Sequence, residues 1–269
     1  MSRDAVDPVE EHVLACLEAS GKRPFVAGIC GAQGSGKSWL AAALADRLAR
    51  TGLRVCTLSL DDLYLTRARR EELARTVHPL LAVRGVPGTH DVALGLDLLD
   101  ALGGEGPVSV PVFDKARDDR APRALWRTVE APVDLLLFEG WCVGALPQPE
   151  AALAIPVNAL EAREDAQGVW RGYANTALAT AYQELFARLD TLILLKAPGF
   201  DIVARWRMEQ EETLRAGMAR DGGSTDGVMD ADAIRRFVSH YERLTRHILH
   251  EMPARADLVV ALDEQRRTG

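Results

Sequence analysis

The sequence predicts an α/β fold in which a five-stranded, mainly parallel sheet lies between two layers of helices. Five short apolar runs recur along the 269 residues and alternate with segments of helical periodicity. These runs are apolar throughout, as strands are when both faces of a parallel sheet are covered. A glycine-rich turn also joins the first run to a strongly helical segment, which is the connection that a βα unit requires.

The elements follow from these patterns in chain order. The predicted strands are residues 25–30, 54–60, 133–138, 191–197 and 257–262, which read FVAGIC, RVCTLSL, VDLLLF, TLILLKA and DLVVAL. The predicted helices are residues 7–20, 39–50, 66–75, 92–102, 174–189 and 231–249. Most of these helices carry apolar side chains or strong helix formers on one stripe, whereas residues 66–75 are charged and are expected to be solvated. A polar, glycine-rich break at residues 222–227 precedes the last helix.

Composition and charge exclude several classes of protein. The formal net charge of −7 provides no diffuse positive field for the phosphates of nucleic acid. No run approaches the roughly 20 apolar residues that cross a bilayer, and the opening MSRDAVDPVEEH carries acids where a signal peptide carries bases. We therefore expect a cytoplasmic protein of one domain, residues 1–269, without a nucleic acid, membrane or obligate protein partner.

The cysteines give no sign of a metal or redox site. The chain has four, Cys16, Cys30, Cys56 and Cys142, and none forms a CxxC pair. In a reducing compartment, scattered cysteines of this kind are expected to be buried small hydrophobic residues.

The strongest local signal is GAQGSGKS at residues 31–38, which satisfies the phosphate-binding pattern GxxxxGKS. Its glycines are expected to let successive amides point at the β-phosphate, and the following helix adds its positive end. Lys37 would reach the β- and γ-phosphates, and the Ser38 hydroxyl would bind Mg²⁺. The predicted nucleotide site comprises Gly31, Ala32, Gln33, Gly34, Ser35, Gly36, Lys37, Ser38 and Trp39. The motif predicts ATP and Mg²⁺ as cofactors and the three-layer α/β/α sandwich of P-loop NTPases.

Acidic residues follow two of the predicted strands, where ligands bind in open α/β sheets. Glu139 ends LLLFEG and is expected to hold Mg²⁺, directly or through water, with a helix cap as the alternative. Asp61 and Asp62 end the second strand, and a kinase needs a carboxylate near the acceptor hydroxyl. Adjacent side chains of a strand point in opposite directions, so Asp61 is predicted to be the catalytic base and Asp62 to have another role.

The segment at residues 78–127 is predicted to be an inserted acceptor-binding region, because long irregular segments in compact enzymes are usually binding loops. Its cations, Lys115, Arg117, Arg120 and Arg123, would form with His90 a pocket for a carboxylate or phosphate on the acceptor. The alternative is a solvated surface on which neighbouring aspartates pair with these cations. The predicted acceptor contacts are Asp62, Tyr64, His90, Asp91, Lys115, Arg117 and Arg120.

Two further features have competing interpretations. Residues 199–228 are predicted to contain a lid in which Arg205 and Arg207 close over the phosphates, although both can instead form ordinary helix pairs with glutamates four residues on. His247 and His250 suggest a metal site, but they lack a third ligand and end a helix whose negative pole favours such residues.

Several blocks together resemble the D-glycerate 3-kinase family, within the phosphoribulokinase, uridine kinase and pantothenate kinase group. They are GICGAQGSGKS, SLDDLYLT, HPLLAVRGVPGTHD, VPVFDKARDDRAP, LLLFEGWCVGA, the NALE to YANTALA stretch and APGFDIVARWRMEQE. The resemblance implies transfer of the ATP γ-phosphate to the 3-hydroxyl of D-glycerate and favours Asp61 as the base. The chain departs from related patterns with Leu63 in place of Phe and with Trp39 directly after Ser38.

Two other functions stay open at this stage. One is a kinase for another small acceptor, such as a nucleoside, pantothenate or a sugar. The other is a nucleotide-gated switch or ATPase, although the NKxD tetrad typical of guanine-specific switches is missing after the fourth predicted strand, which continues as LLKAPGF.

Overall fold

The computed structural model describes residues 5–220 and 230–268 and contains the predicted sheet. Its five strands lie in the order β2 (Val55–Ser59), β7 (Leu135–Gly140), β1 (Phe25–Gly31), β8 (Thr191–Lys196) and β9 (Leu258–Ala261). Every neighbouring pair in this sheet is parallel. The predicted fold class and all five predicted strands are therefore confirmed.

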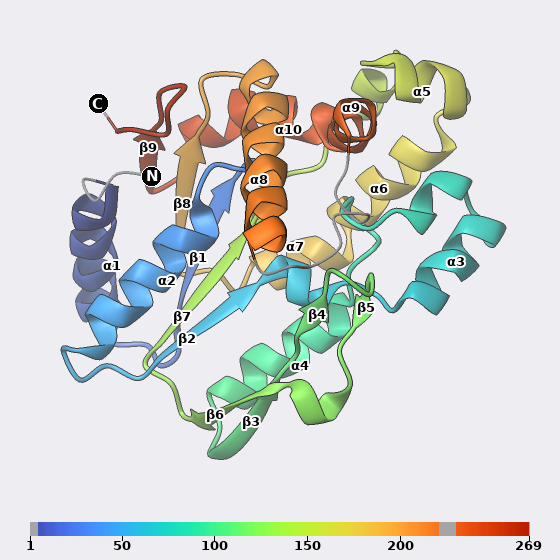
Figure 1. Ribbon diagram of the computed structural model, residues 1–269. Helices are drawn as coiled ribbons and strands as arrows, with labels where there is room; N and C mark the ends of the chain where they lie inside the picture. Colours follow the sequence, from blue (N-terminus) through green and yellow to red (C-terminus); the bar gives the residue numbers. More distant parts are fainter. Residues whose placement is uncertain (1–4, 221–229, 269) are drawn as a thin grey trace.

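Helices cover both faces of the sheet (Figure 1). They are α1 (Val6–Ser20), α2 (Lys37–Ala49), α3 (Arg67–Thr76), α4 (Val92–Leu102), α5 (Ala159–Glu164), α6 (Val169–Ala179), α7 (Ala181–Phe186), α8 (Asp201–Arg220), α9 (Ala231–Ser239) and α10 (Glu242–Glu251). Helices α3, α5 and α6 lie together to one side of the sheet (Figure 1). None of the helices in the described ranges is long and apolar enough to cross a membrane.

The strands divide the hydrophobic core into two layers. Alternate side chains such as Ile29 and Leu137 pack with α1, α2 and α8, whereas Cys30 and Leu136 pack with α4, α7 and α10. All residues of β1 and β7 are buried, while β2 at the edge alternates between buried and half-buried residues. This explains the apolar runs, since a central strand with helices on both faces has no position for a polar side chain.

Three of the four cysteines agree with the expectation that they are buried. All are free thiols, and Cys30, Cys56 and Cys142 are buried while Cys16 is half-buried. Burial raises the pKa of Cys30 to about 12, which outweighs the opposite effect of nearby Lys37. A thiol in that state is a packing group and not a nucleophile.

Two helices predicted as continuous are broken in the structure. The predicted helix at residues 174–189 divides into α6 and α7 at Thr180, whose backbone leaves the helical region (φ −113°, ψ −104°) and whose hydroxyl donates to the Thr176 carbonyl at 2.9 Å. The predicted helix at residues 231–249 divides at His240 and Tyr241, where the Tyr241 ring packs edge-on against Trp141. Tertiary contacts thus override the 3.6-residue period. The predicted break at residues 222–227 lies outside the described residues.

The segment at residues 78–127 is less irregular than its sequence suggests. Besides α4 it contains the antiparallel pair β3 (Gly106–Val110) with β6 (Arg127–Ala131) and the short pair β4 (Phe113–Asp114) with β5 (Asp119–Arg120). These strands were not predicted, because β4 and β5 are too short to show alternation and the strands of the longer pair lie 16 residues apart in the chain. The β4–β5 hairpin is the element that approaches the predicted acceptor site.

One residue of the charged helix α3 is not solvated as predicted. The Arg70 side chain is 1% exposed, and its guanidinium donates to the carbonyls of Leu65 (3.3 Å), Ala82 (2.7 Å) and Asp118 (2.6 Å). It also lies 3.0 Å from the Asp118 carboxylate. Arg70 therefore joins α3 to the neighbouring turn at Ala82 and to the distant β4–β5 hairpin.

We predict that Arg70→Met destabilises the protein by about 3 to 5 kcal/mol, because the buried carbonyls and the Asp118 carboxylate lose their donor while no charge replaces it. Urea unfolding followed by circular dichroism measures the change. The matched control is Arg69→Met, since Arg69 is 69% exposed and pairs with Glu72 on the helix surface. The control is expected to change stability by less than about 1 kcal/mol. Equal losses in the two variants would contradict a structural role for Arg70.

Candidate functional site

The P-loop at residues 31–38 leaves the carboxyl end of β1 and enters α2. Gly34 (φ +78°) and Gly36 (φ +91°) adopt the left-handed conformation that side chains disfavour. A Cβ at Gly34 would lie 2.6 Å from the Cβ of Trp206 on α8. Gly31 has no such conformation, but a Cβ there would lie 2.6 Å from Ser35 Oγ. Two of the glycines thus permit the turn, as the sequence predicted, and Gly31 permits close packing beneath it.

Glu139 and the two polar residues that end the P-loop meet at the edge of the sheet. Ser38 Oγ donates to Glu139 Oε1 at 2.8 Å, and Lys37 Nζ lies 3.9 Å from Glu139 Oε2. Glu139 is 5% exposed, and its Oε2 has no hydrogen-bond partner among the described residues. Lys37 and Ser38 are also the first residues of α2, and Glu139 contacts their side chains. A hydroxyl and a buried carboxylate with an unused oxygen are ligands that suit Mg²⁺.

Asp61 lies in a 3-10 turn, Leu60–Leu63, that directly follows β2. Both of its carboxylate oxygens are bonded: Tyr64 donates to Oδ1 at 2.8 Å and Lys115 Nζ lies 2.6 Å from Oδ2. Burial alone would raise the pKa of Asp61, but the charges of Lys115 and Lys37 together with these hydrogen bonds lower it to about 2. The carboxylate is therefore ionised throughout the physiological range.

Asp62 points away from Asp61, as predicted, although the cause is the 3-10 turn and not the alternation of a strand. Its carboxylate accepts from the Phe113 backbone N–H at 3.1 Å and does not line the cavity described below. Asp62 is also a predicted acceptor contact, and the structure places it away from that cavity. Burial raises the pKa of Asp62. Its contact fixes the start of the β4–β5 hairpin, so Asp62 supports the acceptor region from behind.

A cavity of about 180 Å³ joins the P-loop to Asp61. Eight of the residues predicted for the site line it: Gln33, Gly34, Lys37, Ser38, Asp61, Tyr64, Lys115 and Arg207. Five further residues were not predicted: Arg84, Trp141, Gln210, Phe237 and Tyr241. The blocks that contain Arg84 and Trp141 are part of the family resemblance, but nothing local in the sequence distinguishes these side chains from their neighbours.

His90 does not supply positive charge to an acceptor. It is 5% exposed, its ring stacks on Tyr64 with centroids 4.6 Å apart, and its Nδ1 lies 2.5 Å from the hydroxyl of Tyr182. Burial lowers the pKa of His90 to about 3, with a small opposing effect from Asp61. The neutral imidazole therefore supports the Tyr64 ring and is not a member of the predicted cationic pocket.

Three other predicted acceptor contacts also lie away from the cavity. Asp91 caps α4 by accepting from Leu94 N–H at 3.2 Å and pairs with Arg120 at 3.0 Å. The same Arg120 nitrogen donates to the Tyr64 carbonyl at 3.0 Å. Arg117 is exposed at the tip of the β4–β5 hairpin. For Arg120 the structure is closer to the alternative in which an aspartate pairs with the cation. The pair is partly buried, however, and it orients Tyr64.

The two predicted lid arginines face different parts of the molecule. Arg207 lines the cavity, with its guanidinium carbon 5.5 Å from the Phe237 ring centroid, and it donates to Gln210 at 3.3 Å. Arg205 pairs with Glu264 at 2.8 Å and lines a separate surface depression. Only Arg207 is therefore near the P-loop. Part of the predicted lid, residues 221–228, lies outside the described residues.

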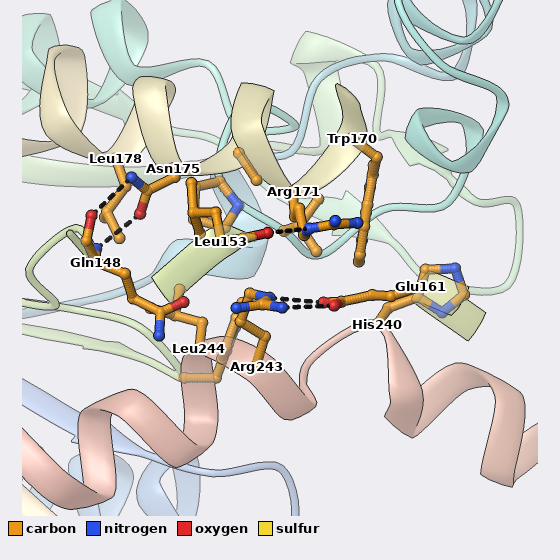
Figure 2. Close-up of a pocket in the computed structure, with 14 residues that line it drawn as sticks. Gln148, Leu153, Glu161, Trp170, Arg171, Asn175, Leu178, His240, Arg243 and Leu244 are labelled. Atoms are coloured by element: carbon orange, nitrogen blue, oxygen red, sulfur yellow. Dashed lines mark hydrogen bonds and ion pairs between the residues drawn. The ribbon is translucent and has the colours of Figure 1, made fainter. Parts of the chain in front are cut away.

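Figure 2 shows a second cavity, of about 40 Å³. Trp141 lines both this cavity and the first. Figure 2 shows the Glu161 carboxylate facing the Arg243 guanidinium, which donates to it at 2.8 and 2.7 Å. Arg243 also donates to the carbonyls of Ala152 and Ile155, so the pair is fully bonded. No residue of the P-loop lines this cavity. Its charges neutralise one another and hold α10 against the segment before α6.

The histidines at the end of α10 do not form part of a larger metal-ligand cluster in the described ranges, where no three His, Cys, Asp or Glu side chains lie close enough to hold an ion. Burial lowers the pKa of His247. The negative end of the helix dipole favours such residues and accounts for the position of His247 and His250.

Comparison with known proteins places the chain among kinases. No family model matches the sequence. It is 35% identical to the uncharacterized kinase mug58 of Schizosaccharomyces pombe, over 88% of this chain and 86% of that protein. It is 32% identical to the chloroplastic D-glycerate 3-kinase of Arabidopsis thaliana, over 97% of this chain but 57% of that protein. Among solved structures, the D-glycerate 3-kinase from Cryptococcus neoformans var. grubii has the same fold, with a TM-score of 0.79, 24% identity and 99% and 98% of the two chains covered.

We predict that Lys115→Met raises the pKa of Asp61 by about 1 unit or more, because it removes the nearest positive charge and one hydrogen bond. ¹³C NMR of labelled aspartate carboxyl groups follows the titration, and Asp61→Asn assigns the signal. In the unaltered protein the signal is expected to stay at its ionised position down to about pH 3. Lys115→Arg is the control that keeps the charge. An unchanged titration in Lys115→Met would show that other groups hold Asp61 ionised.

Proposed function

This chain belongs to the D-glycerate 3-kinase family of P-loop kinases, and from that premise we propose that it transfers the γ-phosphate of ATP to the 3-hydroxyl of D-glycerate. The kinase class follows from the relatives, whereas the acceptor is part of the proposal. The observation that carries it is the single cavity that Asp61 shares with Lys37 and Ser38, since it brings a carboxylate for a hydroxyl beside a phosphate-binding loop.

The proposed reaction uses this geometry directly. The acceptor oxygen attacks the γ-phosphorus, a new O–P bond forms, the bond to the β–γ bridging oxygen breaks, and ADP leaves. The hydroxyl hydrogen-bonds to Asp61 in place of Tyr64 or Lys115, and its proton passes to the carboxylate. Because phosphoryl transfer has a loose transition state, the proton is lost late, so a base with a pKa of about 2 serves mainly to orient the nucleophile.

The other residues of the cavity would stabilise the phosphate chain. Lys37 and Arg207 are the cations that would contact the transferred group, as the P-loop amides contact the β-phosphate. Ser38 and Glu139 would hold Mg²⁺, either directly or through water. The ion, when bound, would neutralise part of the charge of the phosphates.

The charge of the cavity favours an acidic acceptor over the alternatives. Lys37, Arg84, Lys115 and Arg207 line it, against the single carboxylate of Asp61. A nucleoside or neutral sugar makes no use of a positive surface beyond the phosphate site, whereas a hydroxy acid does. Membership of a kinase family removes the nucleotide-gated switch as a candidate. We also propose the cytoplasm as its location and no macromolecular partner as a requirement for activity.

We predict that D-glycerate stimulates ADP release from ATP and Mg²⁺ by the purified protein. The assay compares D-glycerate with L-glycerate, pantothenate, uridine, ribulose 5-phosphate and no acceptor. Selective stimulation by D-glycerate supports the full proposal. Stimulation by another compound of the panel would support the kinase reaction but with that compound as the acceptor. ADP release that does not depend on any acceptor would contradict the proposal.

We predict that two substitutions in the cavity differ in their effect on ATP binding, although both lower turnover. Lys37→Ala is expected to abolish both tight ATP binding and turnover, because it removes the cation nearest the phosphates. Asp61→Asn is expected to leave ATP binding within a few-fold and to lower kcat by about 10² or more, because it removes the carboxylate but keeps its size. Calorimetry of nucleotide binding and the ADP assay separate these effects. Near-normal turnover of Asp61→Asn would exclude Asp61 as the base.

A further inference from the structure

The cationic pocket predicted from the sequence does not form in the structure as expected, so the group that recognises the acid of the acceptor must be sought elsewhere. Of the predicted cations, Arg120 forms an ion pair with Asp91, and Lys115 forms one with Asp61. Lys37 and Arg207 lie on the P-loop side of the cavity. The remaining cavity-lining cation is Arg84, whose partner Asp118 is shared with Arg70.

We propose that Arg84 binds the carboxylate of the acceptor and so selects an acid over a neutral alcohol. The proposal rests on the kinase function proposed above and assigns the residue that sets its acceptor class. The grounds are the position of Arg84, its unbalanced charge and the rigid backbone that carries it.

The first ground is the position of Arg84 relative to Asp61. The Arg84 guanidinium carbon lies 5.4 Å from the Phe113 ring centroid, and Phe113 packs edge-on against Tyr64 with centroids 5.1 Å apart. Tyr64 in turn donates to Asp61. The arginine is therefore linked to the proposed base through two aromatic rings, and it lines the same cavity as Tyr64 and Asp61. A hydroxy acid carries a hydroxyl for Asp61 and a carboxylate for Arg84, so one small acceptor supplies a group to each.

The charge of Arg84 is only partly balanced. Its one hydrogen-bonding partner in the described part of the chain is the Asp118 carboxylate, which is shared with the buried guanidinium of Arg70. Two guanidinium groups on one carboxylate leave a net positive charge. Arg70 is enclosed and bonded to carbonyls, whereas the Arg84 side chain is 24% exposed and lines the cavity. The free N–H groups of a guanidinium fork match a carboxylate in bidentate fashion.

The backbone on both sides of this arginine is held in place. Tyr241 donates its hydroxyl to the Arg84 carbonyl at 3.0 Å, and Trp141 donates its indole N–H to the Gly85 carbonyl at 2.8 Å. Gly85 has φ +135°, and a Cβ there would lie 2.0 Å from the Tyr241 hydroxyl. Both aromatic residues also line the cavity. Arg84 is therefore preorganised, which lowers the entropic cost of binding an acceptor.

The test compares Arg84→Gln with the unaltered enzyme in the ADP assay. We expect the KM for D-glycerate to rise about 10- to 100-fold, as for the loss of hydrogen bonds to a charged group, with the KM for ATP changed less than about 2-fold. The preference for D-glycerate over glycerol, measured as the ratio of kcat/KM values, is expected to fall by a similar factor. Arg84→Lys keeps the charge without the fork and should lie between the two. Arg69→Gln, on the exposed face of α3, is the control and should match the unaltered enzyme.

The outcomes separate this proposal from the one on which it rests. If the unaltered enzyme uses D-glycerate and Arg84→Gln has the same KM and the same preference over glycerol, Arg84 is not the acid-binding residue and the proposed function stands. If the enzyme instead prefers another carboxylate acceptor, the same comparison on that acceptor decides the role of Arg84. If it phosphorylates only neutral acceptors, both proposals are wrong. Circular dichroism and thermal unfolding of each variant exclude loss of fold as the cause.

Discussion

The register of the central parallel strands is the constraint on which the rest of this molecule depends. Neighbouring parallel strands end at the same edge of a sheet, so Ile29 of β1, Glu139 of β7 and Ser59 of β2 lie in one row. The P-loop begins two residues beyond Ile29, and Asp61 follows two residues beyond Ser59. Three segments that are far apart in the chain thus deliver a phosphate loop, an acid and a second acid to one edge of the sheet.

Buried charges organise the other half of the site. The sequence predicted that three charged side chains contact ligands or solvent, yet each forms hydrogen bonds within the protein. They are Arg70, Arg120 and Asp62. Together they fix the β4–β5 hairpin and the turn that carries Asp61. These partners offset the cost of burying the groups, although Arg120 Nε has no hydrogen-bond partner among the described residues. What they provide is a rigid frame for Tyr64 and Arg84.

The same frame explains the electrostatics of the site. Asp61 stays ionised because Lys115 and Lys37 stabilise its charge against burial, and His90 stays neutral because burial dominates. A carboxylate with so low a pKa accepts a hydrogen bond well and a proton poorly, which suits a reaction whose nucleophile is deprotonated late. The cations around it favour phosphates and acids among the possible ligands.

The sequence by itself determined the sheet, the P-loop and the two acids that follow strands, because each depends on a short run of neighbouring residues. Apolar runs encode strands covered on both faces, and GAQGSGKS encodes a turn through glycines such as Gly34 and Gly36. Only the tertiary structure decided which cations face the cavity. Arg84 and Arg120 look alike in the sequence, and their roles differ because Asp91 neutralises one of them while Asp118 is shared between the other and Arg70. Such partners come from elements 29 to 48 positions away, a separation at which no local pattern carries information.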